Sequence, residues 1–442
     1  MQRVTVREGI LEGITGEKSS IFLGVPYAQP PLGSLRFRAP QPVSPWSGVR
    51  SAKQFSHRAW QMTQQGFYEK EFFSNPDYMP AMDEDCLYLN IWTPAKSPSD
   101  RLPVAFWIHG GAFINGFGSE LEFDGEAFAA RGVILVTINY RLGAFGFLAT
   151  PEITEENGGI VGNIAILDQI AALTWLKDNM AAFGGDPKRI TIFGQSAGSM
   201  SCQTLACSPL AQGLFSGVIL QSGGGYRDAL KRDVLAEDAY VIGQKLSDLC
   251  AVRTLAELRA LPAEQIMQAA RSIFESTLGH NVPFYPVLDG HVLTAGYNAS
   301  IEQGLLHQVP FMLGSTRDDL GSEPGLVRPR ASDPFNASCV NMSLWLEKLG
   351  RKPAYVYYFS QLPQGDDAGA FHSSELWYLF GTLERSWRPK TPGDYVVSAA
   401  LSDYWTNFIK TGDPNGSGLP EWRVCSAADP YVQILDDTTL KR

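Results

Sequence analysis

The sequence predicts an α/β fold built on a mostly parallel, doubly wound sheet. Between residues 87 and 221, apolar segments of strand length alternate with helical segments, which is the pattern of parallel strands joined by crossover helices. The segments 104–108 and 189–193 are short, apolar and contain β-branched residues, as buried parallel strands do. The segment 163–183 is long enough to be one of the crossover helices.

The motif Gly194–Gly198 (GQSAG) stands between the predicted strand 189–193 and a helix predicted over 199–206. In the order strand, G-x-S-x-G, helix, the serine occupies a strained turn that leaves its hydroxyl exposed above the sheet edge. The flanking glycines leave room for the backbone, and the helix N-terminus favours developing negative charge. We therefore predict that Ser196 is a nucleophile. The alternative is a Gly/Ser loop without chemistry.

A second loop, His109–Phe113 (HGGAF), follows the predicted strand 104–108. A loop with few side chains lets backbone N–H groups turn inward and point at a single oxygen atom. In the α/β-hydrolase arrangement, this loop and the amide of Ala197 would form an oxyanion hole. A Gly-Gly turn is common by itself, but its order relative to Ser196 favours this interpretation.

The same arrangement places an acid and a histidine after the serine, so the histidines can be sorted by position. The six are His57, His109, His280, His291, His307 and His372. The first two precede the serine, and the next two lie in turn-like segments. The fifth ends a helix predicted over 301–306, where it would interact with the helix dipole. His372 follows the apolar strand 354–359 and a polar loop, which is where this fold delivers its base.

The acid should follow a strand that lies between the serine and the histidine in the chain. The segment 309–314 is that strand, and two adjacent aspartates, Asp318 and Asp319, come after it. One would face the imidazole, and the other would be a solvated loop charge or a partner for Arg317. The residue pattern leaves this choice open.

Five longer motifs follow one another along the chain. They are Gly24–Pro31, Leu35–Pro40, Glu84–Asn90, Asn139–Gly143 and Phe183–Gly198. In content and order these motifs resemble the type-B carboxylesterase family, and within it the bacterial p-nitrobenzyl esterases. The resemblance implies an α/β-hydrolase fold and hydrolysis of carboxylic esters through an acyl-enzyme, with no metal or organic cofactor.

The resemblance also implies the roles of single residues. It makes Ser196 the nucleophile and His372 the base. It places the acid at Asp319, where most relatives have Glu. Ser222 matches a serine that hydrogen-bonds the acid in relatives, and we expect it to support the site from behind.

The oxyanion donors implied by the resemblance are the backbone N–H groups of Gly111, Ala112 and Ala197. Ala112 stands where the family usually has a third glycine. A backbone donor survives this change, but the methyl group narrows the space over the acyl carbon.

Other matches to the family are structural. Arg36 with Glu84, and Arg141 with Asp168, resemble its buried ion pairs, which fix geometry more reliably than they add stability. No cysteine precedes Cys86, so the disulfide that eukaryotic members form at this segment lacks its partner.

The sequence departs from the cholinesterases of the same family at two places. Gln195 precedes the nucleophile where those enzymes have Glu, and we expect it to lie beside the site. The loop 72–78 contains aromatic residues but no Trp. Because cation–π recognition of choline needs such a cage, cholinesterase activity is disfavoured.

The net charge of −10 is spread along the chain without long runs of like charge. This composition argues against nucleic acids or anionic membranes as partners and agrees with an enzyme. No run of about 18 apolar residues suggests a membrane span. The six cysteines have no regular spacing, which predicts neither a disulfide scaffold nor a metal site. The segment 1–9 lacks the apolar stretch of a signal peptide. We expect a bacterial, cytoplasmic monomer or dimer.

We expect one domain over 1–442. Its catalytic core covers about 85–225 and 305–442, and a helical cap covers about 228–300. The loop 321–334 is rich in Gly, Pro and Arg and is predicted to be mobile near the site.

The substrate is less defined than the chemistry. Feruloyl or acetyl esters of plant cell walls, xenobiotic esters and amides are alternatives, because specificity depends on pocket shape. A non-catalytic binding protein on the same fold is a further alternative, disfavoured because every triad position is filled.

Overall fold

The computed structural model describes residues 2–63, 65–227, 233–277, 283–320, 330 and 333–440. The strands are β1 (Arg3–Val6), β2 (Gly9–Glu12), β3 (Ile14–Thr15), β4 (Ser20–Pro26), β5 (Val49–Ser51), β6 (Tyr88–Thr93), β7 (Leu102–Ile108), β8 (Ile134–Ile138), β9 (Gly185–Gln195), β10 (Gly217–Gln221), β11 (Val234–Leu235), β12 (Val287–Leu288), β13 (Phe311–Thr316), β14 (Tyr355–Phe359) and β15 (Gln433–Leu435). The helices are α1 (Phe67–Phe72), α2 (Glu126–Ala129), α3 (Gly143–Phe147), α4 (Pro151–Glu156), α5 (Ile164–Asn179), α6 (Ala197–Cys207), α7 (Ala236–Leu249), α8 (Leu255–Ala260), α9 (Ala263–Thr277), α10 (Tyr297–Glu302), α11 (Pro334–Lys348), α12 (Leu376–Leu379) and α13 (Pro392–Thr411).

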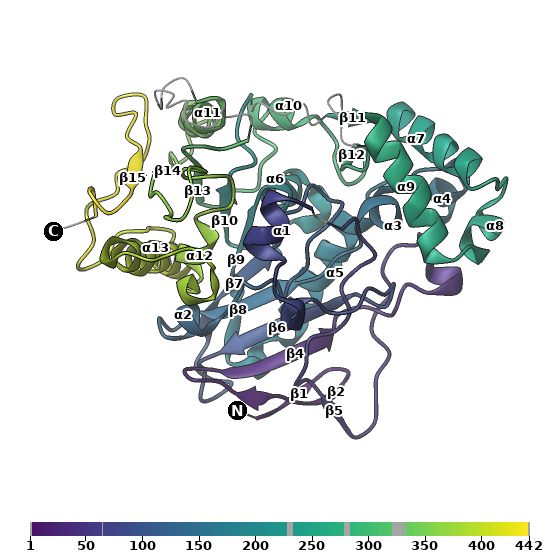
Figure 1. Ribbon diagram of the computed structural model, residues 1–442, viewed down its shortest axis with the longest axis horizontal. Helices are drawn as coiled ribbons and strands as arrows, with labels where there is room; N and C mark the ends of the chain where they lie inside the picture. Colours follow the sequence, from purple (N-terminus) through teal and green to yellow (C-terminus); the bar gives the residue numbers. More distant parts are fainter. Residues whose placement is uncertain are drawn as a thin grey trace.

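A ten-stranded sheet runs through the molecule in the order β15-β14-β13-β10-β9-β7-β8-β6-β4-β3 (Figure 1). Neighbouring strands from β15 to β8 are parallel. The pairs from β8 to β3 are antiparallel. The prediction of a mostly parallel α/β-hydrolase sheet is therefore confirmed. Because parallel strands end at one edge, the segments that follow β7, β9, β13 and β14 meet there.

Alternation along the strands divides the interior into two hydrophobic cores. On β7, Val104, Phe106 and Ile108 belong to one core, whereas Ala105 and Trp107 belong to the other. Side chains alternate between the two faces of a strand, so each face needs its own cover. Helices α5 and α6 pack on the first face and α2 and α13 on the second.

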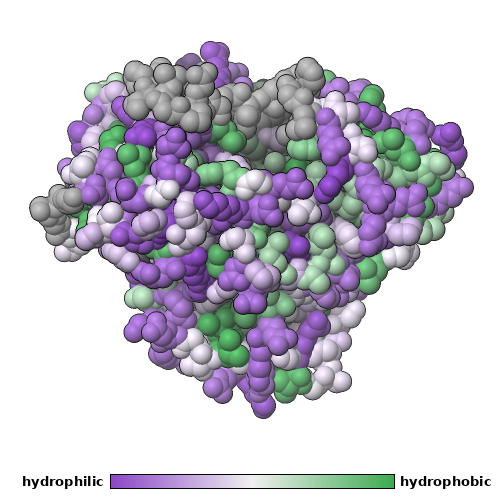
Figure 2. Space-filling view, viewed as in Figure 1, coloured by the Kyte–Doolittle hydropathy of each residue, from purple (hydrophilic) through white to green (hydrophobic). Residues whose placement is uncertain are grey.

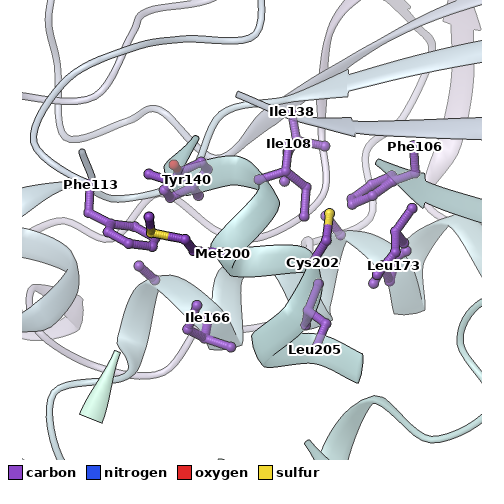
Figure 3. Close-up of a cluster of buried hydrophobic side chains, with 14 of the residues drawn as sticks. Phe106, Ile108, Phe113, Ile138, Tyr140, Ile166, Leu173, Met200, Cys202 and Leu205 are labelled. Carbon is purple, nitrogen blue, oxygen red and sulfur yellow. The ribbon is translucent and has the colours of Figure 1, made fainter. Parts of the chain in front are cut away.

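The first core holds the helix that follows the serine against the sheet. Figure 3 shows part of it, with Phe106, Ile108, Phe113, Ile138, Tyr140, Ile166, Leu173, Met200, Cys202 and Leu205 turned toward one another. Every residue of α6 is buried. At about 1.5–3 kcal/mol for each large apolar side chain buried, this packing gives the helix a rigid position behind the serine.

Most predicted elements of the core are present with small changes of boundary. The predicted helix 163–183 is α5 followed by a 3-10 turn over Met180–Phe183. At the N-terminus, β1 and β2 form an antiparallel hairpin, and β5 joins them in a separate three-stranded sheet. Strands β3 and β4 instead extend the main sheet.

The two predicted ion pairs are present and buried. Arg36 binds Glu84 with Nε 2.7 Å from Oε2, and its Nη1 donates to the carbonyl oxygen of Leu261 at 2.6 Å. Arg141 binds Asp168 through two nitrogens, at 2.8 and 2.6 Å. These bonds join loops near the N-terminus to the core and to the end of α8.

Helices α7 to α9 form a group beside α3 and α4 (Figure 1, right). Helix α9 packs on α7 and α3. Apolar side chains reach the surface in this region (Figure 2), where Val241 and Leu249 of α7 are exposed. Helices α7 to α9 lie within the segment predicted to be the cap, about residues 228–300. Most of the loop predicted as mobile over 321–334 lies outside the described residues.

Candidate active site

Ser196 sits at a strained turn between β9 and α6, as the motif predicts. Its φ of 56° and ψ of −125° are unusual for a residue with a side chain, which indicates a conformation held by its surroundings. The amide of Ser196 donates to the carbonyl oxygen of Gln221 on β10 at 2.8 Å. A Cβ atom on Gly198 would collide with the carbonyl oxygen of Ile108, and one on Gly194 would collide with Gly198. Only glycine therefore fits at positions 194 and 198, two residues before and two residues after the serine.

The loop after β7 has three successive residues in the left-handed region. They are Gly111, Ala112 and Phe113, with φ of 97°, 53° and 61°. The amides of Ile114 and Asn115 both donate to the carbonyl oxygen of Gly111, at 3.0 Å each, and close the turn. Within the described part of the chain, the amides of Gly111 and Ala112 donate no hydrogen bond. Ala197 is the first residue of α6, where an N–H has no partner in its own helix.

His372 binds Asp319, and the carboxylate is held from several sides. Nδ1 of His372 lies 2.5 Å from Oδ1 of Asp319. Oδ2 accepts hydrogen bonds from the amide and the hydroxyl of Thr316, at 3.1 and 3.0 Å, and Oδ1 accepts one from the amide of Leu320 at 2.8 Å. Burial would raise the pKa of Asp319, but the charge and hydrogen bond of His372 and the other donors lower it below the ordinary value. The carboxylate is therefore ionised.

Asp318 points away from the imidazole. Its carboxylate binds Arg317 at 2.6 Å and accepts a hydrogen bond from the amide of Ala370 at 2.7 Å. Its own amide donates to the carbonyl oxygen of Ala370 at 3.0 Å. The expectation of an Arg317 partner is met, but Asp318 is more than a solvated charge, because it ties this loop to the one that carries His372.

Gln195 contacts the histidine directly. Its Nε2 lies 3.1 Å from Nε2 of His372 and 3.5 Å from Nδ1. No hydrogen bond joins Ser196 to His372 in the described residues, although both line one cavity. The imidazole nitrogen that faces away from Asp319 therefore meets an amide group.

Ser222 lies behind the site, directly after β10. Its amide donates to the carbonyl oxygen of Gly314 at 2.8 Å. Its hydroxyl is close enough to contribute to the lowered pKa of Asp319, but Oγ falls outside standard hydrogen-bond geometry. The hydroxyl therefore faces the acid without a full hydrogen bond.

One cavity of about 180 Å³ is lined by Ser196, Gln195, His372 and the loop after β7, whereas Asp319 and Ser222 are not among its lining residues. It is lined by Tyr68, Phe72, Phe73, Gly110, Gly111, Ala112, Asn115, Glu120, Glu122, Phe123, Gln195, Ser196, Leu320, His372, Ser373 and Leu376. The sequence analysis missed Asn115, Glu120 and Glu122. These residues lie on an irregular loop where no periodicity marks them as buried.

The other described histidines, His57, His109, His291 and His307, lie outside the cavity lining. His109 is buried against the ring of Tyr140, with centroids 4.4 Å apart, and burial lowers its pKa to about 4. The prediction for His307 is wrong. Helix α10 ends at Glu302, and Nε2 of His307 lies 2.9 Å from the carbonyl oxygen of Ser208. His291 follows a turn at Asp289, and His280 lies outside the described residues.

Comparison with known proteins agrees with this geometry. The sequence profile of the Carboxylesterase family matches residues 1–326 and 334–442. The chain belongs to the type-B carboxylesterase family. It is therefore a serine hydrolase that cleaves carboxylic esters.

Relatives of this carboxylesterase cover nearly its whole length. It is 32% identical to the para-nitrobenzyl esterase of Bacillus subtilis, over 98% of this chain and 95% of that protein. It is 34% identical to the fumonisin B1 esterase of Sphingopyxis macrogoltabida, over 94% of this chain and 83% of that protein. The solved structure of a thermophilic PNB esterase superposes with a TM-score of 0.88 at 31% identity, covering 99% of this chain and 96% of that one.

The described residues contain no group of three or more His, Cys, Asp and Glu side chains arranged to hold a metal ion. No described helix is both long and apolar enough to cross a membrane.

Proposed function

We propose that this carboxylesterase works through a triad of Ser196, His372 and Asp319. The observation that carries the proposal is the 2.5 Å contact between Asp319 and His372, which lines the same cavity as Ser196. The ionised Asp319 keeps the proton of the imidazole on Nδ1, so Nε2 is free to accept the proton of the serine. Ser196 attacks the ester carbonyl, His372 returns the proton to the leaving alcohol, and water then cleaves the acyl-enzyme.

The amides of Gly111, Ala112 and Ala197 serve as the oxyanion hole in this proposal. The left-handed backbone of Gly111 and Ala112 supports the role, because it turns consecutive amides in unusual directions and leaves them without acceptors in the described chain. Each donor would lower the barrier by roughly 3 kcal/mol.

Gln195 and Ser222 support the triad from either side in the same proposal. The amide of Gln195 faces Nε2 of His372 at 3.1 Å and occupies the place that the Ser196 hydroxyl needs during reaction. We expect Gln195 to hold the imidazole in the resting enzyme and to yield when the substrate binds. The hydroxyl of Ser222 helps to keep Asp319 ionised.

The shape of the cavity supports small acyl groups. Its volume of about 180 Å³ is below the roughly 300–1,000 Å³ that is common for ligand sites. Ala112 is one of its lining residues. We propose short to medium acyl chains, with bulky or aromatic leaving groups. A panel of p-nitrophenyl esters of rising chain length, with feruloyl and anilide substrates beside it, tests this preference. Activity that rises steadily toward long-chain esters would contradict it.

Substitution of the serine tests the mechanism. Ser196→Ala should abolish ester hydrolysis and labelling by a fluorophosphonate, while the circular dichroism spectrum stays that of a folded protein. Ser373 is the other serine in the cavity lining, so Ser373→Ala is the matched control and should still be labelled at Ser196. Turnover near that of the wild type in Ser196→Ala, or labelling mapped to another serine, would refute the assignment.

We further propose a single domain over 1–442 with α7 to α9 as its cap region, a monomer or dimer, and a location in the bacterial cytoplasm. The continuous ten-stranded sheet and the similarity to a Bacillus esterase support these proposals. Limited proteolysis, sedimentation and cell fractionation test them in turn.

A further inference from the structure

One wall of the cavity holds two buried carboxyl groups that the triad does not use. Glu120 and Glu122 lie on the loop after β7, and their side chains are 7% and 1% exposed. Burial raises the pKa of both carboxyl groups, and the nearby Glu120 raises the pKa of Glu122 further, so the pair keeps a proton where isolated carboxyl groups would both be ionised. A pair that keeps one proton carries one negative charge inside the cavity wall.

The protein supplies few groups to neutralise this charge. The amide of Phe117 donates to Glu120 at 2.8 Å. Among the described residues, no lysine or arginine forms an ion pair with either carboxyl group. Arg385, on the side of Glu122, is paired with Asp124. The guanidinium of Arg58, on the side of Glu120, lies over the ring of Phe117 with its Cζ 5.5 Å from the ring centroid.

A second observation points to a ligand with hydrogen-bond donors. Oε2 of Glu122 and Oδ1 of Asn115 are buried and have no hydrogen-bond partner in the described chain. Asn115 is 4% exposed, and both residues line the cavity. Oδ1 of Asn115 is an acceptor, and Oε2 of Glu122 is one whenever that oxygen does not carry the proton of the carboxyl group. Buried acceptors without donors are costly, so a ligand that brings donors gains from filling them.

We infer that the wall formed by Asn115, Glu120 and Glu122 recognises the protonated primary amine of an ester substrate. A primary ammonium carries three donors and a positive charge, which match two unpaired acceptors and one negative charge. Tyr68, Phe72 and Phe123 line the same cavity, and aromatic rings attract cations. This inference rests on the proposed function, because Ser196 at the other wall is taken as the nucleophile.

The inference separates primary from quaternary ammonium groups. A quaternary ammonium has no N–H, so it would leave both acceptors unpaired. The small volume of the cavity also means that an amine at this wall lies only a few bonds from an ester carbonyl at Ser196. Esters of small amino alcohols or of amino acids have this arrangement.

Amine binding should depend on pH. Burial raises the pKa of Glu120 to about 7, against smaller lowering effects of its hydrogen bonds and of Arg58. Burial and the neighbouring carboxyl raise the pKa of Glu122 further, while Arg385 lowers it. Tyr140 also lies near Glu120 and stays neutral because burial raises its pKa. Binding should therefore strengthen as the pH rises through 7, while the amine is still protonated.

The test compares three compounds of similar shape: benzylammonium, benzyl alcohol and benzyltrimethylammonium. Calorimetry with the wild-type enzyme measures their binding at about pH 6 and about pH 8, and inhibition of p-nitrophenyl acetate hydrolysis shows whether they occupy the cavity. The variant is Glu122→Gln. Glu69→Gln is the matched control, because Glu69 is an exposed residue of α1, the helix that also supplies Tyr68 and Phe72 to the cavity.

Benzylammonium should bind at least about tenfold more tightly than either other compound near pH 8, and the difference should shrink near pH 6. Glu122→Gln should abolish the preference and Glu69→Gln should keep it. Equal binding of the three compounds to the wild type overturns the inference even if Glu122→Gln does not fold. A preference that survives in folded Glu122→Gln overturns it too. Hydrolysis without amine preference refutes only this inference, whereas amine binding without hydrolysis refutes the proposed function.

Discussion

Asp319, which binds His372 from outside the cavity lining, and the Glu120–Glu122 pair in the cavity wall are buried to a similar degree, but their pKa values shift in opposite directions. Asp319 is 3% exposed and Glu122 is 1% exposed. The pKa of Asp319 is lowered, whereas the pKa values of Glu120 and Glu122 are raised. Burial alone therefore does not decide the charge of a carboxyl group at this site.

The number of donors explains the difference. Asp319 accepts hydrogen bonds from Thr316, Leu320 and His372. These donors replace the water molecules that would otherwise hydrogen-bond its ionised form. At the cavity wall, the amides of Phe117 and of Glu122 itself are the backbone donors near two carboxyl groups, and burial outweighs their effect on the pKa values. A carboxylate that accepts many hydrogen bonds stays ionised and can orient a histidine. A carboxyl pair with few hydrogen-bond donors can instead bind a ligand that supplies N–H donors.

The largest expected effect comes from removing the negative charge of Asp319, the carboxylate with many hydrogen-bond donors. Asp319→Asn should lower kcat by about 10⁴, because the amide cannot hold the imidazole in the correct tautomer. The matched control is Asp318→Asn, whose carboxylate faces Arg317 and Ala370 instead of the histidine. It should lower kcat by less than about tenfold. Stopped-flow or steady-state kinetics on one p-nitrophenyl ester measures both, and the reverse ranking would move the acid to Asp318.

Another buried carboxyl group, Glu375, sharpens the comparison because it is near Asp319 and poor in donors. Gln221 donates to its Oε1 at 3.3 Å, and its Oε2 has no partner in the described chain. Burial is the main cause that raises its pKa to about 7. The pKa of Glu375 is therefore higher in the folded protein than its value of 4.5 in the unfolded chain. Its contribution to the stability of the folded protein is fully present below pH 4.5 and is lost as the pH rises through 7.

Glu375→Gln should therefore gain stability relative to the wild type between about pH 4.5 and about pH 7, up to about 3 kcal/mol. Urea unfolding at several pH values measures the difference. Exposed Glu17→Gln should show no such pH dependence. A constant difference between wild type and Glu375→Gln across this range would show that Glu375 is ionised in the folded protein.

The parts of the site that depend on contiguous residues could be predicted from the sequence. The turn at Ser196 is such a part, because the glycines that it needs lie within two residues of it. The pairing of His372 with an aspartate depends on β13 and β14 being neighbours. Chain order indicated the histidine, but only the structure shows that the carboxylate of Asp318 binds Arg317 and the amide of Ala370.

The remaining parts had no local signal. Glu120 and Glu122 have the sequence of a solvated loop, and nothing near them shows that both are buried. The error at His307 has a similar origin. The chain leaves helix α10 at Glu302, and Gly304 adopts a φ of 69°, which a pattern of apolar spacing cannot show. Propensity and spacing describe elements, whereas burial of loops depends on what packs over them.

The smallest expected effect tests whether single donors set the charge of Asp319. The hydroxyl of Thr316 donates to Oδ2 at 3.0 Å, while the amide of the same residue donates at 3.1 Å. Thr316→Val removes the first bond and keeps the second, so we expect a loss of about 1 kcal/mol in unfolding free energy and about a fivefold fall in kcat. Ser315→Ala is the control, because the buried hydroxyl of Ser315 has no partner in the described chain and its removal should be neutral or stabilising. Equal losses in the two variants would mean that the hydroxyl of Thr316 contributes packing alone, and that the backbone amides and His372 suffice to keep Asp319 ionised.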